Sequence, residues 1–250
     1  MRRLPHRRRT VDMRGQQLSI DPSESSGFYL YYEREYDDQI FNFLNSIIGR
    51  YVVALDIGAN IGVYTCYLAA RVPQVIAFEP DPAVCAWLRS NLALNRLNNV
   101  TVHQACVGRE KGMVKFFSAE DRNSGIGSMI DAPGASREMP CVCLDDLFQP
   151  PFGPCLIKLD IEGAEWLALQ GARRLLSAPD VSVDILMEVH PEQLQKAGVS
   201  LHDLHALLAQ MGYQIFGIGT GGLIPLPPQA RGERFWWATR SPVQSNSRPR

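Results

Sequence analysis

The chain has 250 residues, of which 46% are hydrophobic and 20% are charged. These proportions are those of a globular protein with one large core, so we expect one principal domain. The formal net charge of −1 excludes an overall field that would gather nucleic acid or anionic membranes, and no apolar run reaches the roughly 18 residues that a membrane span needs.

The two ends of the chain are polar. The first fourteen residues carry six arginines and a single acidic residue, and no apolar stretch with a cleavage site follows them. We therefore predict that residues 1–26 are a basic, disordered extension rather than a targeting peptide. The serine- and proline-containing tail, 241–250, is also predicted to be disordered.

Residues 27–240 are predicted to form one domain. It begins with a helical cover, 27–50, in which aromatic and aliphatic residues recur at helical spacing and pack over the open end of a sheet. The residues predicted on its packing face are Tyr32, Tyr36, Ile40, Phe43, Leu44 and Ile47. From residue 51 onward, short β-branched runs alternate with amphipathic stretches, which is typical of a mostly parallel α/β sheet with helices on both faces. The predicted strands are 51–56, 74–78, 99–105, 155–159, 182–189, 213–218 and 234–239, and the predicted helices are 62–71, 82–95, 163–176 and 200–211.

An insertion, 112–145, interrupts this alternation. We predict a hairpin of residues 113–118 and 139–143 around a long loop rich in glycine and serine. Long loops of this kind inside compact domains are usually functional, so we expect the loop 119–138 to cover a substrate or cofactor.

The six cysteines lack the Cys-x-x-Cys spacing of a zinc site. We interpret them as reduced, mostly buried thiols in a cytoplasmic protein.

The first strand and the loop after it predict a binding site. In an open α/β sheet, ligands bind at the carboxyl ends of the strands, where Asp56 and Glu79 end the first two strands. Between them, Gly58, Asn60 and Gly62 form a loop whose backbone a ligand can approach closely. Glu79 lies 21 positions after Gly58, the spacing at which a carboxylate accepts hydrogen bonds from ribose hydroxyls.

Asp56 indicates which cofactor this loop binds. A carboxylate at this place would repel a pyrophosphate by about 4 kcal/mol at ~4 Å, which disfavours a dinucleotide. S-adenosylmethionine carries an ammonium and a sulfonium and no phosphate, so Asp56 favours it. The pattern Gly-x-Asn-x-Gly also departs from the dinucleotide pattern Gly-x-Gly-x-x-Gly. A role of Asp56 in capping the turn is the alternative.

Further polar residues end the fourth predicted strand. Lys158, Asp160 and Glu162 fall at or near the cleft, and an unpaired carboxylate such as Asp160 at the end of a buried strand needs a partner. Glu162 is equally well explained by the positive end of the following helix. Glu165 is expected on the surface of that helix.

Glu188 and His190 end the fifth predicted strand on one face, because side chains in a strand repeat every two residues. A histidine held by a carboxylate is a suitable general base for a hydroxyl group, although many such histidines are structural. Asp160, Glu162, Glu188 and His190 would also suit a metal, but we predict that no metal is bound.

Taken together, these segments resemble the FkbM family of methyltransferases over roughly residues 27–218. The matching segments are LDIGANIGVYT (55–65), IAFEPDP (76–82), SNLALNRLNNVTVHQACVG (90–108), VCLDDL (142–147), LIKLDIEGAEWLALQGA (156–172) and MEVHP (187–191).

The resemblance implies a class I methyltransferase fold, a Rossmann-like three-layer sandwich with a mostly parallel seven-stranded sheet whose last strand is antiparallel. It also implies S-adenosylmethionine as cofactor and methyl transfer to a hydroxyl of a sugar, glycolipid or secondary metabolite. By similarity, Asp56, Gly58, Asn60 and Gly62 line the methionine end of the cofactor and Glu79 its ribose. His190 held by Glu188, or Asp160 directly, is our hypothesis for the proton acceptor.

Two other functions stay open at this point. One is an NAD(P)-dependent oxidoreductase, which Asp56 and the absent third glycine disfavour. The other is a non-catalytic, cofactor-binding partner subunit, for which we would expect degraded ends of the fourth and fifth strands.

Overall fold

The computed structural model describes residues 8–33, 36–118, 127–130, 135–229 and 234–243. Its strands are β1 (Arg9–Met13), β2 (Gln16–Ile20), β3 (Val53–Ile57), β4 (Gln74–Phe78), β5 (Val100–His103), β6 (Cys106–Val107), β7 (Gly112–Ser118), β8 (Gly127–Ser128), β9 (Ser136–Val142), β10 (Phe152–Leu159), β11 (Val181–Glu188), β12 (Gln214–Gly219), β13 (Gly222–Pro225) and β14 (Phe235–Thr239). Its α-helices are α1 (Ser25–Phe28), α2 (Asp38–Ile47), α3 (Val63–Ala69), α4 (Pro82–Leu94), α5 (Leu144–Leu147), α6 (Glu165–Gln170), α7 (Arg173–Ser177), α8 (Pro191–Lys196) and α9 (Leu201–Gln210).

The central sheet has the strand order β13-β12-β14-β11-β10-β3-β4-β5. The neighbours among β11, β10, β3, β4 and β5 pair in parallel, whereas β14 runs antiparallel to both β11 and β12. The predicted mostly parallel sheet with an antiparallel last strand is therefore confirmed. An eighth strand, β13, extends the edge by pairing with β12 through a tight turn that the sequence analysis did not predict.

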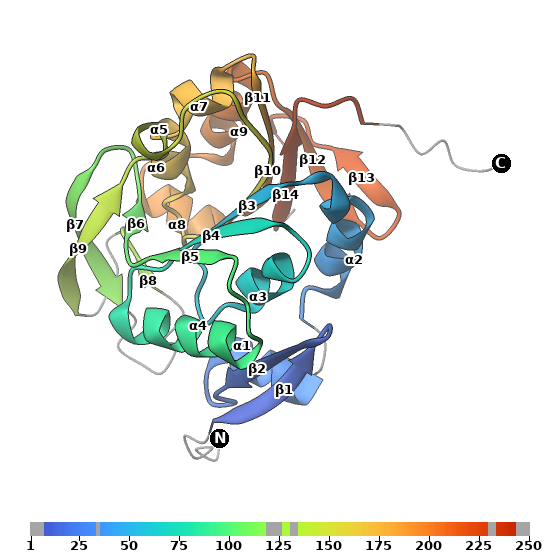
Figure 1. Ribbon diagram of the computed structural model, residues 1–250. Coiled ribbons are helices and arrows are strands. Elements are labelled where there is room, and N and C mark those ends of the chain that lie inside the picture. The colour runs from blue at the N-terminus through green and yellow to red at the C-terminus, as the bar shows by residue number, and fades with distance from the viewer. Residues whose placement is uncertain (1–7, 34–35, 119–126, 131–134, 230–233, 244–250) are drawn as a thin grey trace.

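Helices cover both faces of this sheet and make three layers (Figure 1). On one face, α2, α3 and α4 bury Leu44, Tyr67 and Leu88 against the sheet. On the other face, α6 to α9 bury a second apolar cluster that includes Leu169 and Leu208. Because the two faces of each strand are both covered, the parallel strands are apolar along most of their length.

The predicted helix 163–176 is divided into α6 and α7. The break lies at Gly171, where a side chain would not fit because a Cβ atom there would stand 2.1 Å from the carbonyl oxygen of Gly108. The segment that follows β6 therefore packs directly against the break, in a region where periodicity alone predicts one continuous helix.

The N-terminal segment is the main correction to the sequence analysis. Within residues 1–26, predicted to be disordered, β1 and β2 form an antiparallel hairpin in which Leu18 and Ile20 are fully buried. Side chains of α4 satisfy the backbone of β2: Asn91 accepts from the amide of Ser19, and the Trp87 indole donates to the Ser19 carbonyl. The hairpin is thus part of the core, while residues 1–7 and 244–250 lie outside the described residues.

The helical cover 27–50 is also less regular than predicted. The short α1 continues into a π-helical turn, Tyr29–Glu33, and α2 begins only at Asp38. Tyr36, which helical spacing placed on the packing face, instead lies in a bend before α2. Ile40 and Leu44 of α2 are buried in the core as expected, and Phe41, which helical spacing did not place on the packing face, is buried beside them.

The insertion contains the predicted hairpin, in which β7 and β9 pair antiparallel within a small sheet of order β6-β9-β7-β8. Phe116, Met139 and two cysteines form its own apolar cluster. Most of the loop 119–138 lies outside the described residues, so its role as a cover stays a prediction.

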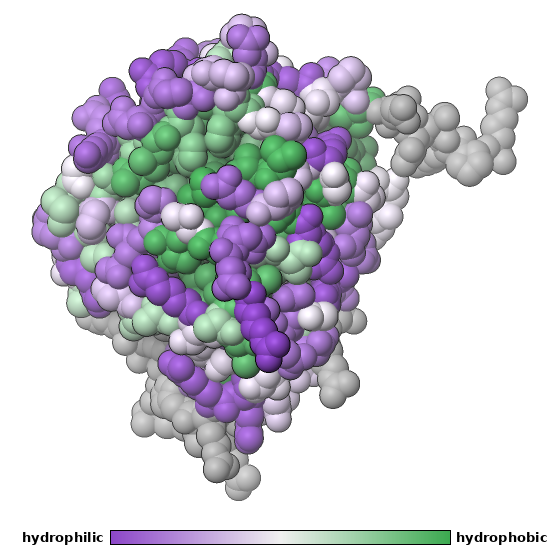
Figure 2. Space-filling model, in the orientation of Figure 1, coloured by the Kyte–Doolittle hydropathy of each residue, from purple (hydrophilic) through white to green (hydrophobic). Residues whose placement is uncertain are grey.

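All six cysteines are buried and free, as predicted. Among the described residues, no helix has both the length and the apolar character needed to cross a bilayer. Figure 2 shows hydrophilic residues around the rim of the visible face and apolar residues nearer its centre.

We predict that Leu18→Ala lowers the free energy of unfolding by about 2–5 kcal/mol, because it leaves a cavity under the hairpin. Thr10→Ala, at an exposed position of β1, is the control and should change stability by less than about 0.5 kcal/mol. Urea denaturation measures both. Equal stability of the two variants would mean that the hairpin is not packed.

Candidate active site

The loop after β3 folds tightly against the end of β10. Gly58 has φ +82°, and a Cβ atom there would stand 1.8 Å from the carbonyl oxygen of Asp160. Gly62 has φ +94°, and a Cβ atom there would stand 2.5 Å from Leu88 of α4. Both positions favour glycine for their backbone angle, and Gly58 also requires it for space, because the atom that a side chain would meet there belongs to the backbone. The loop is therefore fixed against the strand end that carries Asp160.

Asp56 is fully buried beneath this loop. Its Oδ2 accepts a hydrogen bond from Thr65 Oγ1 at 2.5 Å, so its observed partner is a side chain of α3 rather than the backbone of the turn. Among the described residues its Oδ1 has no hydrogen-bond donor and lies 4.0 Å from Lys158 Nζ. Burial raises the pKa of Asp56, while Lys158 and Thr65 oppose that change.

Glu79 ends β4 and is held by two backbone amides. Its carboxylate accepts hydrogen bonds from the amides of Asn60 and Asp81, each at 2.9 Å. Burial raises the pKa of Glu79 to about 7 in spite of these bonds. Glu79 and the loop of Gly58, Asn60 and Gly62 thus meet at the carboxyl ends of β3 and β4, where the sequence analysis expected them.

Lys158 lies near the carboxyl end of β10, the strand that pairs with β3. It lies directly opposite Asp56 in the register of β10 and β3, and its side chain is only 5% exposed. Its ammonium donates to Asp160 Oδ2 at 3.0 Å. Burial would raise the pKa of Asp160, but Lys158 and His190 outweigh it and hold that pKa below its usual range.

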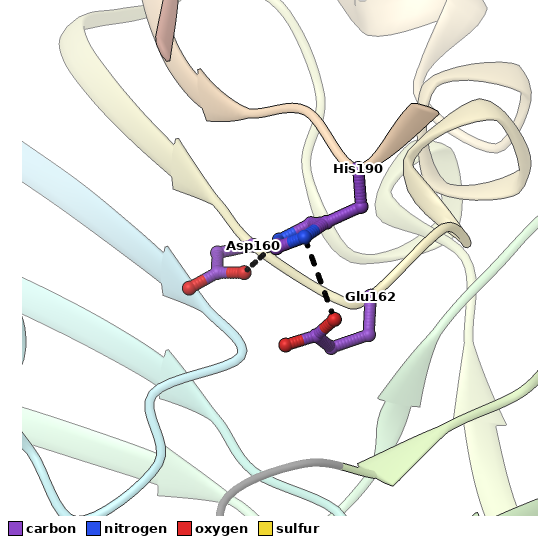
Figure 3. Close-up of side chains that lie close together, drawn as sticks. All are labelled: Asp160, Glu162 and His190. Carbon is purple, nitrogen blue, oxygen red and sulfur yellow. Dashed lines mark hydrogen bonds and ion pairs between the residues drawn. The ribbon is translucent and has the colours of Figure 1, made fainter. Parts of the chain in front are cut away.

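His190 lies among three carboxylates, of which Figure 3 shows Asp160 and Glu162. Its Nε2 is 3.3 Å from Asp160 Oδ1 and 3.5 Å from Glu188 Oε1, and its Nδ1 is 3.6 Å from Glu162 Oε2. Burial alone would lower the pKa of His190, but the carboxylates outweigh it and raise the pKa to about 9. The imidazole is therefore mainly protonated at neutral pH in the protein without ligand.

Arg234 neutralises part of this negative charge. Its guanidinium contacts Glu188 Oε1 through Nε at 2.6 Å and through Nη2 at 2.5 Å. Burial raises the pKa of Glu188, and Asp160 raises it further. Sequence reasoning missed Arg234, because an arginine just before a strand carries no pattern that predicts its partner.

Asp160, Glu162 and His190 also form a possible metal-binding group. One donor atom from each residue lies within 4.8 Å of the others. Carboxylate oxygens with one imidazole nitrogen suit several divalent cations. Lys158 already pairs with Asp160, however, and this ammonium offsets charge that a cation would otherwise compensate.

The residue assigned to the helix surface, Glu165, is instead fully buried. Its Oε1 accepts hydrogen bonds from the amides of Ile161 and Gly163 in the turn before α6. Glu165 is therefore the acidic residue at the start of α6, the role that the sequence analysis considered for Glu162. The carboxylate of Glu162 instead faces His190.

Tyr36 and Asp37, which precede α2, lie near the carboxyl ends of the same strands. Tyr64 of α3 donates to Asp37 Oδ2 at 2.9 Å, and its ring lies 4.8 Å from Lys158 Nζ. Burial raises the pKa of Tyr36, with contributions from Asp37, Asp160 and Glu188. Sequence analysis did not place Tyr36 at the site, because it assigned this residue to a helix that begins only at Asp38.

The arrangement has two adjoining parts. One is a glycine loop flanked by the buried carboxylates of Asp56 and Glu79, which suits a cationic ligand with vicinal hydroxyls. The other is His190 with its three carboxylates, which suits proton exchange with a neutral hydroxyl. Lys158 lies between them.

Comparison with known proteins identifies relatives of this chain. Residues 56–215 match the family described as Methyltransferase FkbM domain. Methyltransferase 1 of Beauveria bassiana is 40% identical over 58 residues, which are 22% of this chain and 23% of that protein. The AMB antimetabolite synthetase AmbE of Pseudomonas aeruginosa is 35% identical over 107 residues, 41% of this chain and 5% of that protein.

Among solved structures, the methyltransferase FkbM from Methylobacillus flagellatus is 23% identical, with a TM-score of 0.46. The match covers 74% of this chain and 42% of that one. The chain thus matches less than half the length of each of these three proteins.

We predict that the ligand-free protein loses stability as pH rises from 5.5 to 9. Glu79 and Glu165 have pKa values near 7 when folded and 4.5 as reference, so their contribution is present below pH 4.5 and is lost as pH rises through about 7. His190 contributes below pH 6.5 and loses this contribution through about pH 9. Urea denaturation at several pH values measures the slope.

Glu79→Gln should flatten the part of this slope between pH 5.5 and 7, whereas Glu110→Gln, at an exposed position, should leave it unchanged. Stability that increased over this range in the parent protein would contradict the prediction.

Proposed function

Because the chain belongs to the FkbM methyltransferase family, we propose that it transfers the methyl group of S-adenosylmethionine to a hydroxyl oxygen of a small molecule or glycan. The observation that carries the proposal is the adjacency of two sites: the loop with Asp56 and Glu79, and the His190 cluster at the neighbouring strand end.

The residues of the loop fit this cofactor. Asp56 keeps one buried carboxylate oxygen without a hydrogen-bond donor among the described residues, beside a loop that excludes side chains at Gly58 and Gly62. This negative charge suits the methionine end, which carries an ammonium and a sulfonium. Each Glu79 oxygen accepts one backbone amide and has a further lone pair for a ribose hydroxyl. The backbone amide of Asn60 holds the Glu79 carboxylate in this position.

S-adenosylmethionine supplies an electrophilic methyl group, so the protein's task is to hold the hydroxyl in line and to take its proton. We assign the proton to His190, with Glu188 and Asp160 holding the ring. Since the pKa of His190 is about 9 without ligand, the positive charge of a cofactor bound in the adjoining loop favours the neutral imidazole that a base requires. Asp160 is the second candidate for the proton acceptor. No metal is needed for this role.

The acceptor is proposed to be a hydroxyl on a sugar, glycolipid or secondary metabolite. The partial match to an antimetabolite synthetase supports the last of these classes. The buried free thiols support a reducing compartment, so we propose a cytoplasmic location.

For the cofactor, we predict that S-adenosylhomocysteine binds and NAD does not. Glu79→Gln should weaken binding by roughly 10- to 100-fold, because hydrogen bonds to a charged group contribute about 1.5–3 kcal/mol. Glu110→Gln should bind like the parent protein. Isothermal titration calorimetry measures all three. Tight binding of NAD would instead favour an oxidoreductase.

For methyl transfer, we predict that labelled S-adenosylmethionine and cell-extract fractions yield a labelled hydroxyl compound. The value of kcat/KM, which reports the free protein, should rise with pH toward about 9, as His190 loses its proton. His190→Ala should lower the rate by roughly 100-fold or more, the usual contribution of a general base. His202→Ala, an exposed histidine, is the control.

Full activity of both His190→Ala and Asp160→Asn would refute the assignment of the base. Binding of the cofactor without transfer to any fraction would favour a non-catalytic partner subunit.

A further inference from the structure

Lys158 is a buried cation to which the proposed reaction has so far given no role. It lies within β10, between apolar neighbours on both sides in the sequence, and its side chain is 5% exposed. A lysine so deeply buried is rare unless it is paired. Its position therefore has a specific electrostatic reason.

Several charged or titratable groups face Lys158 from the elements packed around it. They are Asp56 on β3, Tyr36 before α2, Tyr64 on α3, Asp160 after β10 and Glu188 at the end of β11. His190 and Arg234 are the cations that share the carboxylates Asp160 and Glu188 with it. Lys158 is thus the most deeply buried positive charge of this group.

The contacts of Lys158 differ in length. Its ammonium is 3.0 Å from Asp160 Oδ2, a direct hydrogen bond, and 4.0 Å from Asp56 Oδ1. The other oxygen of Asp160, Oδ1, is the one that faces His190 Nε2 at 3.3 Å. Lys158 and His190 therefore hold opposite oxygens of one carboxylate, and the ammonium fixes the orientation in which Asp160 meets the imidazole.

We propose that Lys158 is a positioning residue that acts through Asp160: its hydrogen bond to Oδ2 fixes this carboxylate with Oδ1 toward His190, and its positive charge offsets part of the negative charge around the imidazole. The inference rests on the proposed role of His190 as proton acceptor. Lys158 is not itself the base: burial alone would lower the pKa of its ammonium, but its carboxylate neighbours outweigh burial and stabilise the charged form.

The proposal gives opposite signs for two substitutions. Lys158→Met removes a positive charge, so the remaining carboxylates hold the His190 proton more strongly. Asp160→Asn removes a negative charge and the direct partner of His190, so the imidazole loses its proton more easily. A general loss of packing would not move the two titrations in opposite directions.

The test is an NMR titration of the His190 ring in the full chain, with and without S-adenosylhomocysteine. His190→Gln identifies the signal among the five histidines. We expect the midpoint in Lys158→Met to move to higher pH, with roughly a tenfold decrease in the neutral fraction below it. In Asp160→Asn we expect a move to lower pH. Lys115→Met, an exposed lysine, is the matched control.

If Lys158→Met does not fold, Asp160→Asn is compared with the double variant Lys158→Met/Asp160→Asn. The double variant leaves no Asp160 carboxylate without its lysine partner, so it should fold. Adding Lys158→Met to Asp160→Asn should still raise the His190 midpoint, through the lost charge. An unchanged midpoint in the folded Lys158 variant would overturn the proposal. The titration needs no turnover, so absence of methyl transfer by the parent protein would count against the proposed function alone.

Discussion

The register between β3 and β10 is the constraint on which the site depends. It places Lys158 opposite Asp56, so a buried cation and a buried carboxylate face the same side of the sheet at the point where both strands end. A slip of one residue would turn Lys158 toward the opposite apolar layer, where it would have no partner. Removing one member of a buried pair is costly, so this pairing specifies the register as well as the charge of the site.

Much of the architecture follows from local patterns. Short β-branched runs marked all seven principal strands, and the residues that end β3, β4, β10 and β11 were expected to meet because the carboxyl ends of parallel strands lie together. Asp56, Glu79, Asp160, Glu188 and His190 could be found in this way. Their roles came from the chemistry of each side chain and from resemblance to a family.

The missed features depend on contacts between distant segments. The β1–β2 hairpin is hidden in an arginine-rich sequence because its few apolar residues, such as Leu18, are buried only once α4 supplies partners for the strand. Helical spacing predicts Glu165 on the surface of a helix, whereas in the fold two amides of the turn before α6 donate to its buried carboxylate. Arg234 is separated from Glu188 by 46 positions, and no local pattern predicts such a pair.

The hydrogen bond from the Asn60 amide to Glu79 ties the loop after β3 to the end of β4 before any ligand arrives. The loop conformation is therefore stabilised during folding, and a ligand that contacts both segments meets them already ordered. Preorganisation of this kind reduces the conformational entropy lost on binding. Affinity at this edge of the sheet should then depend mainly on charge and hydrogen bonding, with little contribution from induced ordering of the backbone.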